Sequence, residues 1–168
     1  QRQMCIRDSC SAAALTMITA TAWAPAPTWP TWALLATIGA WVAVIDAITT
    51  WIPAVLAWTG WAGWIGAVAV TALSDHTAAI RAVIATAIIF AAWMIAWLIS
   101  RGGFGFSDVR ITPLWAAPAA ATGIDTIQVT VIAGLTLIAL YALIDRFRHH
   151  TTRFLPCAPI LCSSALIG

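Results

Sequence analysis

The sequence contains no glutamate and no lysine, so its charged groups are aspartates, arginines and histidines alone. Charged residues make up 8% of the 168 residues, whereas soluble domains carry roughly 25%. So few charges cannot cover a water-facing surface, which excludes an ordinary soluble domain. The formal net charge of +2 also gives no basis for binding nucleic acid.

Cysteine pairs with the spacing of a metal site are also absent. The four cysteines are Cys5, Cys10, Cys157 and Cys162. None belongs to a Cys-x-x-Cys motif, which forms half of many structural zinc sites. We therefore expect no metal and no organic cofactor, and we interpret the cysteines as buried, inert thiols.

Apolar segments dominate the chain, which is 62% hydrophobic and has eleven tryptophans. A membrane-spanning helix needs about 20 mostly apolar residues, and tryptophan favours the membrane–water interface. Six segments approach that length, and Pro113 and Pro118 are expected to interrupt the fourth. We predict an all-α, multi-pass membrane protein, a bundle of about six transmembrane helices. The segments are 31–49, 52–73, 78–100, 108–122, 126–144 and 154–168.

The start of the chain is expected to stand apart from this bundle. Residues 1–9 resemble translated sequencing-adapter sequence, so we expect a non-native tail there. Residues 10–30 are predicted to form part of an upstream helix followed by a proline-rich linker. The predicted transmembrane domain then covers residues 31–168. Pro25, Pro27 and Pro30 are expected to break the chain before the first full span.

Arginines gather on one side of the predicted bundle, and the positive-inside rule assigns that side to the cytoplasm. His149 and His150 are expected to join them in a basic loop that faces anionic lipid headgroups. The opposite side has only Arg81, with Asp75, His76 and Asp125 as expected solvated turn residues. The arginines of the first side are Arg101, Arg110, Arg146, Arg148 and Arg153.

Three glycines recur within segment 52–73, at Gly60, Gly63 and Gly66. Small residues at this kind of spacing let a neighbouring helix approach closely in a membrane. We interpret this pattern as packing.

Two aspartates are the candidates for chemistry, because an ionisable group within or beside a span is costly and often functional. Asp46 lies in the apolar run WVAVIDAITTWIP, and Asp108 follows a glycine-rich stretch in RGGFGFSDVRITP. Each aspartate can also be explained without a role in chemistry. Asp46 at a helix end can extend to water, and Ser107 or Asp108 can cap the fourth helix.

Alternating spans bring Asp46 and Asp108 to the same predicted side of the membrane. Two carboxyl groups brought close in a low-dielectric site do not both ionise easily, so they share a proton. The ionised member can then activate a water, and the protonated member can protonate a carbonyl oxygen or a leaving amine. This chemistry hydrolyses a peptide bond without a covalent intermediate.

Three short motifs occur in an order that resembles type IV prepilin peptidases. Residues 46–53, DAITTWIP, are similar to that family's Asp-x6-Pro segment. Residues 103–111, GFGFSDVRI, are similar to its Gly-x-Gly-x-Gly-Asp-Val-Lys-Leu motif, and residues 155–161, LPCAPIL, to its final Pro-Phe-Gly-Pro-Phe-Leu helix. The resemblance covers roughly residues 31–168.

The resemblance implies an aspartic endopeptidase of the bacterial inner membrane that removes leader peptides from prepilins or pilin-like precursors at the cytoplasmic face. Asp46 and Asp108 would be its catalytic pair. Ser107 stands where the family has its third glycine, and Arg110 keeps the charge of the family's lysine. The supporting motif residues are Pro53, Gly103, Gly105, Ser107 and Arg110.

Two other hypotheses remain open at this stage. The first is a small helical transporter or channel subunit in which the aspartates relay protons. Such a relay needs polar residues that continue through the bilayer, and the segments offer only scattered threonine and serine. The second is an inactive peptidase homologue, to which only Ser107 points.

Overall fold

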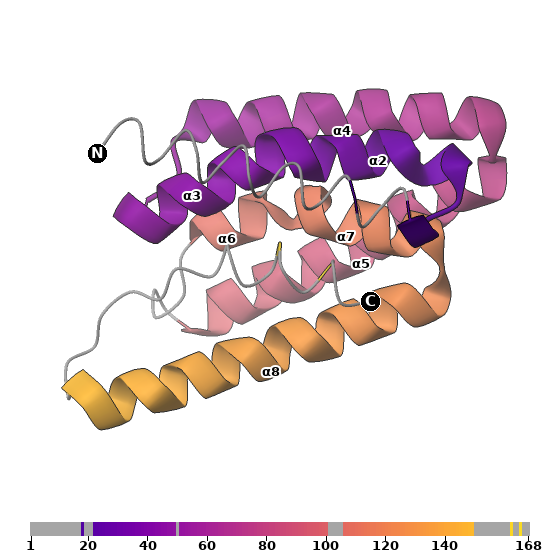
Figure 1. Cartoon of the computed structure of the whole chain (residues 1–168). Helices are drawn as coiled ribbons and strands as arrows, with labels where there is room; N and C mark the ends of the chain where they lie inside the picture. The colour runs from indigo at the N-terminus through magenta and orange to yellow at the C-terminus, as the bar shows by residue number, and fades with distance from the viewer. Residues whose placement is uncertain are drawn as a thin grey trace.

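The chain folds as an all-α bundle, in a computed structural model that describes residues 18, 22–49, 51–100, 106–149, 162 and 165. Among these residues there are helices and no strands. Helices suit this composition, because a helix satisfies its own backbone hydrogen bonds where lipid offers none. The predicted fold class is therefore confirmed, with the elements arranged as in Figure 1.

The first helical segment begins earlier than predicted. It comprises a 3₁₀ turn, η1 (Ala26–Thr28), and then α2 (Trp29–Leu34), η2 (Leu35–Gly39) and α3 (Ala40–Thr49). Pro25 lies just before η1, and Pro30 lies in the first turn of α2. Proline is tolerated in a first turn, where its missing N–H has no helical partner. Pro25 is not helical and separates the helical residues 22–23 from η1, as the predicted break requires, whereas Pro27 and Pro30 lie inside the helical segment.

The five residues of η2 form a π-helix inside this segment, a feature that the sequence analysis did not predict. A π-helical turn is wider than an α-helical turn and is rare outside single-turn insertions. The Gly39 carbonyl of this turn accepts a hydrogen bond from the Cys162 thiol, with 3.9 Å between sulfur and oxygen.

Helices α4 (Ala54–Ser74) and α5 (His76–Ser100) form an antiparallel hairpin. Pro53 occupies the N-cap of α4. Asp75 forms the turn, where its Oδ1 accepts a hydrogen bond of 2.9 Å from the backbone N–H of Ala78 in the first turn of α5. Both helices agree with the predicted segments 52–73 and 78–100 to within about two residues.

The fourth predicted segment is two helices, α6 (Phe106–Arg110) and α7 (Thr112–Thr122), which are separated at Ile111. Pro113 lies in the first turn of α7, as its missing N–H allows. Pro118 lies inside α7 without ending it, so the interruption predicted there is wrong. The packing of α7 on all sides holds its backbone helical despite the lost hydrogen bond.

Helix α7 lies at the centre of the bundle, between α2 and α4 on one side and α5 and α8 on the other (Figure 1). Every residue from Thr112 to Ala121 is buried, and α7 contributes to each of the three buried apolar clusters found among the described residues. Its alanine-rich sequence suits this position, because small side chains let neighbouring helices approach closely.

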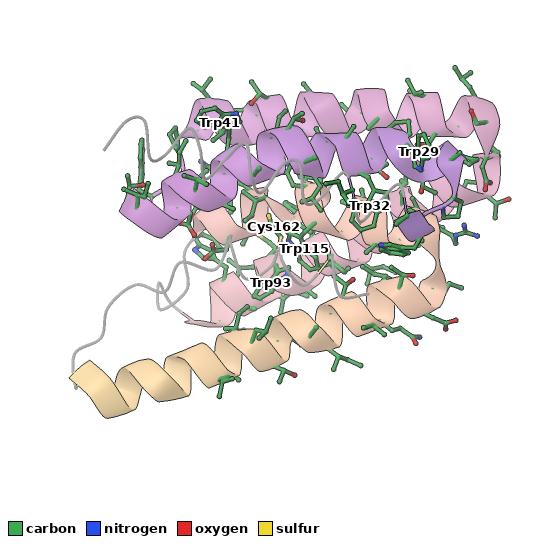
Figure 2. The ribbon with its side chains drawn as sticks, viewed as in Figure 1. Trp29, Trp32, Trp41, Trp93, Trp115 and Cys162 are labelled. Atoms are coloured by element: carbon green, nitrogen blue, oxygen red, sulfur yellow. The ribbon has the colours of Figure 1, made fainter. Side chains whose placement is uncertain are left out.

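One of these clusters contains Trp32, Trp115 and Cys162, and Trp93 packs against it (Figure 2). Trp32 also donates a hydrogen bond from Nε1 to Thr122 Oγ1 at 3.1 Å, which ties α2 to the end of α7. Cys162 is buried, as expected for an inert thiol. The other three cysteines lie outside the described residues.

Helix α8 (Ile124–His149) is longer than predicted. Its backbone is helical through residues 145–149, so His149 belongs to the helix and not to the predicted basic loop. The sixth predicted segment, 154–168, lies outside the described residues except for Cys162 and Ala165.

Within the described part of the chain, three helical stretches are long and apolar enough to cross a membrane: Ala26–Asp46, Ala54–Ser74 and His76–Ile99. Ile124–Leu140 is a shorter apolar stretch. Large apolar side chains such as Leu73, which is 88% exposed, also cover the outer surface. An outer surface of this kind suits lipid and not water. The chain is therefore a helical membrane protein.

Candidate functional site

Asp46 lies in α3 and is only 3% exposed. Val42, one turn earlier on the same helix, is fully buried, and Ile52 after the helix end is 4% exposed. A carboxyl group in such surroundings is costly unless it is hydrogen-bonded or paired. The alternative in which Asp46 extends into water does not fit this burial.

Asp108 lies in the short helix α6 and is 5% exposed. Its neighbour Val109 is fully buried, and Ser107 is half-buried. Because α6 begins at Phe106, Ser107 and Asp108 are inside its first turn and not at its N-cap. The capping alternative for these two residues is therefore wrong.

The structure brings Asp46 and Asp108 to the same end of the bundle, where α3 ends and α6 begins (Figure 1). Val42, close to Asp46 on α3, and Ile111, close to Asp108 in sequence, belong to one buried apolar cluster. Ile52, which follows α3, belongs to it as well. Two buried acids thus share one end of an otherwise apolar bundle.

Helix α4 connects the surroundings of the two aspartates. Its N-cap, Pro53, accepts backbone hydrogen bonds through its carbonyl from Leu56 at 3.0 Å and Ala57 at 3.2 Å. Two turns further along, Trp61 Nε1 donates to the Arg110 carbonyl at 3.0 Å. The first turns of α4 are therefore tied to α6 by this hydrogen bond. Pro53 supports the site by starting this helix.

Arg110 is half-buried at the end of α6, and its guanidinium lies over the ring of Phe106, 4.6 Å from the ring centre. Arg81 marks the opposite end of the bundle, where its Nη2 donates to the Ala121 carbonyl at 3.0 Å. Asp125 is exposed at that far end. Arg110 and the two buried aspartates therefore lie at one end, and Asp75, Arg81 and Asp125 at the other.

The structure also contains a groove that the sequence analysis missed. It has a volume of about 280 Å³ and lies between α4, α5 and α6. Its lining comes from helices distant in sequence, so no local pattern could have revealed it. The lining residues are Ala57, Trp58, Trp61, Phe90, Phe106 and Arg110.

A metal centre has no basis in the part of the chain that the structure describes. Within it, no group of three or more histidine, cysteine, aspartate or glutamate side chains is gathered in a way that could hold an ion. Of the other motif residues, Gly103 and Gly105 lie outside the described residues.

No protein-family model, no curated protein and no solved structure matches this chain. The resemblance to prepilin peptidases therefore depends on its three motifs. The structure describes most of the first motif and, from the second, α6 with Ile111. The third motif, residues 155–161, lies outside the described residues.

Proposed function

We propose that this protein is an intramembrane aspartic endopeptidase that removes leader peptides from type IV prepilins or pilin-like precursors. Asp46 and Asp108 would form its catalytic pair. The observation that carries the proposal is the burial of these two carboxyl groups at one end of an apolar helical bundle. Acids are rarely buried in a membrane protein without a function.

The chemistry follows from a shared proton. In a low-dielectric site one carboxyl group stays ionised and removes a proton from water, while the other protonates the substrate carbonyl and then the departing amine. The apolar cluster around Val42 and Ile111 would limit access of bulk water to this pair. The titration would belong to the pair and not to either aspartate.

The proposed location is the cytoplasmic face of the bacterial inner membrane. Arg110 and the arginine-rich C-terminal part of α8 belong to the same side as the two aspartates in the predicted topology. A precursor whose leader remains in the cytoplasm would present its cleavage site at that depth.

The test is to co-express the protein with a prepilin in cells that lack their own prepilin peptidase. Cleavage is measured on a gel as the decrease in size from prepilin to pilin. Asp46→Asn and Asp108→Asn keep the side-chain volume and remove the ionisable group. Each is expected to reduce cleavage by roughly 10²-fold or more, with the protein still in the membrane fraction.

Asp125→Asn is the matched control, because Asp125 is exposed at the other end of the bundle. It is expected to cleave the precursor at the wild-type rate. If the Asp46→Asn or the Asp108→Asn variant still processes the precursor at that rate, the two-aspartate mechanism is wrong.

The proton-relay alternative retains one supporting observation. Among the described residues, six buried side-chain atoms have no hydrogen-bond partner, and they are distributed over α4, α5, α7 and α8. They are Trp64 Nε1, Thr71 Oγ1, Arg81 Nε, Thr86 Oγ1, Trp115 Nε1 and Thr130 Oγ1. Water bridging these atoms could continue a polar path from the aspartates.

Aspartate-to-glutamate substitution separates the two functions. A relay needs only a titratable group, so Asp46→Glu and Asp108→Glu would still carry protons into liposomes. Peptide hydrolysis needs the two carboxyl groups at a fixed separation, so the same substitutions are expected to abolish cleavage. Proton flux that depends on the aspartates, without any cleavage, would favour the relay.

A further inference from the structure

The groove between α4, α5 and α6 combines aromatic walls with one cation. Trp58, Trp61, Phe90 and Phe106 supply the rings, and Arg110 supplies the charge. Neither Asp46 nor Asp108 lines it. The groove is therefore separate from the two carboxyl groups assigned to peptide hydrolysis, and what it binds is a separate question.

Arg110 is held in place from two directions. Its guanidinium lies over Phe106, which in turn packs against Trp97 with ring centres 4.9 Å apart. Its backbone carbonyl accepts the hydrogen bond from Trp61, and the Trp61 ring packs edge-on against Phe90 at 5.5 Å. The Arg110 side chain is thus held against the aromatic rings that line the groove.

The Arg110 guanidinium has no acidic partner within the described part of the chain, and no residue there accepts a hydrogen bond from it. A guanidinium is always ionised and offers five N–H donors in a fork that matches phosphate oxygens. At the edge of a low-dielectric region such a cation favours an anionic partner. The positive charge in the groove therefore favours an anionic ligand.

The apolar lining and the exposure of the groove indicate which kind of anion. The Trp61 ring bonds to the Arg110 carbonyl and packs against Phe90, so the cation and the rings lie close together in the bundle. Trp58 is 68% exposed on the outer surface of α4. The groove thus offers one cation beside apolar rings on an outer surface that suits lipid, which favours an anion that carries an apolar chain.

We propose that this groove binds one anionic phospholipid. Its phosphate pairs with the Arg110 guanidinium, and one acyl chain lies against Trp58, Trp61 and Phe90. Basic pockets between helices at a membrane surface recognise anionic headgroups in this way. The site does not depend on the peptidase proposal, because none of its contacts involves the two aspartates.

The test measures binding of phosphatidylglycerol to delipidated full-length protein in neutral maltoside micelles, with bound lipid counted by native mass spectrometry. The wild type is expected to hold one tightly bound lipid. Arg110→Gln is expected to weaken this binding by about tenfold or more, the loss of charge-assisted hydrogen bonds. Arg110→Lys keeps the charge and is expected to retain part of the affinity.

A matched tryptophan pair tests the acyl-chain contact. Trp58→Ala should weaken lipid binding several-fold, whereas Trp51→Ala should leave it unchanged, because Trp51 is similarly exposed at 64% but does not line the groove. Unchanged helical circular dichroism identifies the variants that are folded and can be compared.

Three results would overturn the proposal. The first is equal phosphatidylglycerol binding by the wild type and Arg110→Gln. The second is displacement of the lipid by inorganic phosphate at millimolar concentration, which would make the groove a site for free phosphate. The third is displacement by an apolar pilin-derived peptide in preference to lipid, which would make it part of the substrate site.

Discussion

Replacing Gly63 by alanine is expected to destabilise the bundle relative to the same substitution at Gly66, although both glycines lie on α4. A methyl group at Gly63 would lie 2.5 Å from Leu34 Cδ1, whereas a methyl group at Gly66 would meet nothing within 4 Å. Leu34 is 7% exposed within a packed apolar cluster, so its own methyl group has little room to move.

The size of the effect follows from two opposing terms. Glycine inside a helix is less favourable than alanine by roughly 0.5–1 kcal/mol, and this gain is common to both substitutions. Overpacking a closely packed contact costs about 1–3 kcal/mol, and only Gly63→Ala incurs it. The difference between the two variants therefore isolates the contact between α2 and α4, with Gly63→Ala less stable by about 1–3 kcal/mol.

Reversible unfolding in mixed micelles of increasing dodecyl sulfate fraction measures this difference, with helical circular dichroism as the signal. Gly60→Ala supplies an intermediate case, because its methyl group would lie 3.3 Å from Leu114 Cδ2. We expect the stability order Gly66→Ala, Gly60→Ala, Gly63→Ala. Equal stabilisation at Gly63 and Gly66 would refute the close packing of α2 against α4.

Two further predictions concern a buried hydrogen bond and the glycine motif. Trp32→Phe keeps most of the ring but removes the donor to Thr122 Oγ1, so the free energy of unfolding should fall by about 0.5–1.5 kcal/mol. Trp32→Phe and Thr122→Val should be non-additive in the same unfolding assay, and strict additivity would contradict the bond. Ser107→Gly restores the family motif before Asp108 and should change prepilin cleavage by less than about tenfold, since serine is a small departure. A cleavage activity that appears only in Ser107→Gly would instead identify the natural chain as an inactive homologue.

The spanning helices were predictable because length and apolar composition determine them locally. Proline at position 53 and aspartate at position 75 mark the two ends of α4, and the structure places its ends beside these residues. The first helix was less well bounded, because Pro30 was taken to precede a span that in fact includes it. Proline in a first turn and proline in a linker have the same local sequence signal.

The central position of α7 was not predictable from its own residues. Its sequence contains Pro113 and Pro118, which argue against a regular span, yet residues from Thr112 to Ala121 are buried as one helix. The packing of four neighbouring helices keeps this segment helical and buried. The sequence of a single segment does not indicate which helices pack around it. The break at Ile111, which gives α6 its own helix, has the same origin.

For the candidate site, the sequence predicted the two acids and their common side but not their surroundings. The motifs identified Asp46 and Asp108, and alternation of the spans placed them together. Their burial among Val42, Ile52 and Ile111 depends on contacts between distant segments. The same is true of the groove beside Arg110.

The π-helical turn at Leu35–Gly39 sets the rotational phase of everything that follows it on the same helix, Asp46 included. Such a turn accommodates one more residue than an α-helical turn, so later residues are rotated by about 100° relative to an uninterrupted helix. Removing a single residue from this turn would therefore restore regular α-helical winding and leave the later residues, Asp46 included, on the side that they now occupy. A one-residue deletion between Gly39 and Asp46 would instead rotate Asp46 by about 100°, away from its buried side. An alignment of related chains should therefore tolerate a one-residue gap within this turn more readily than a gap between the turn and Asp46.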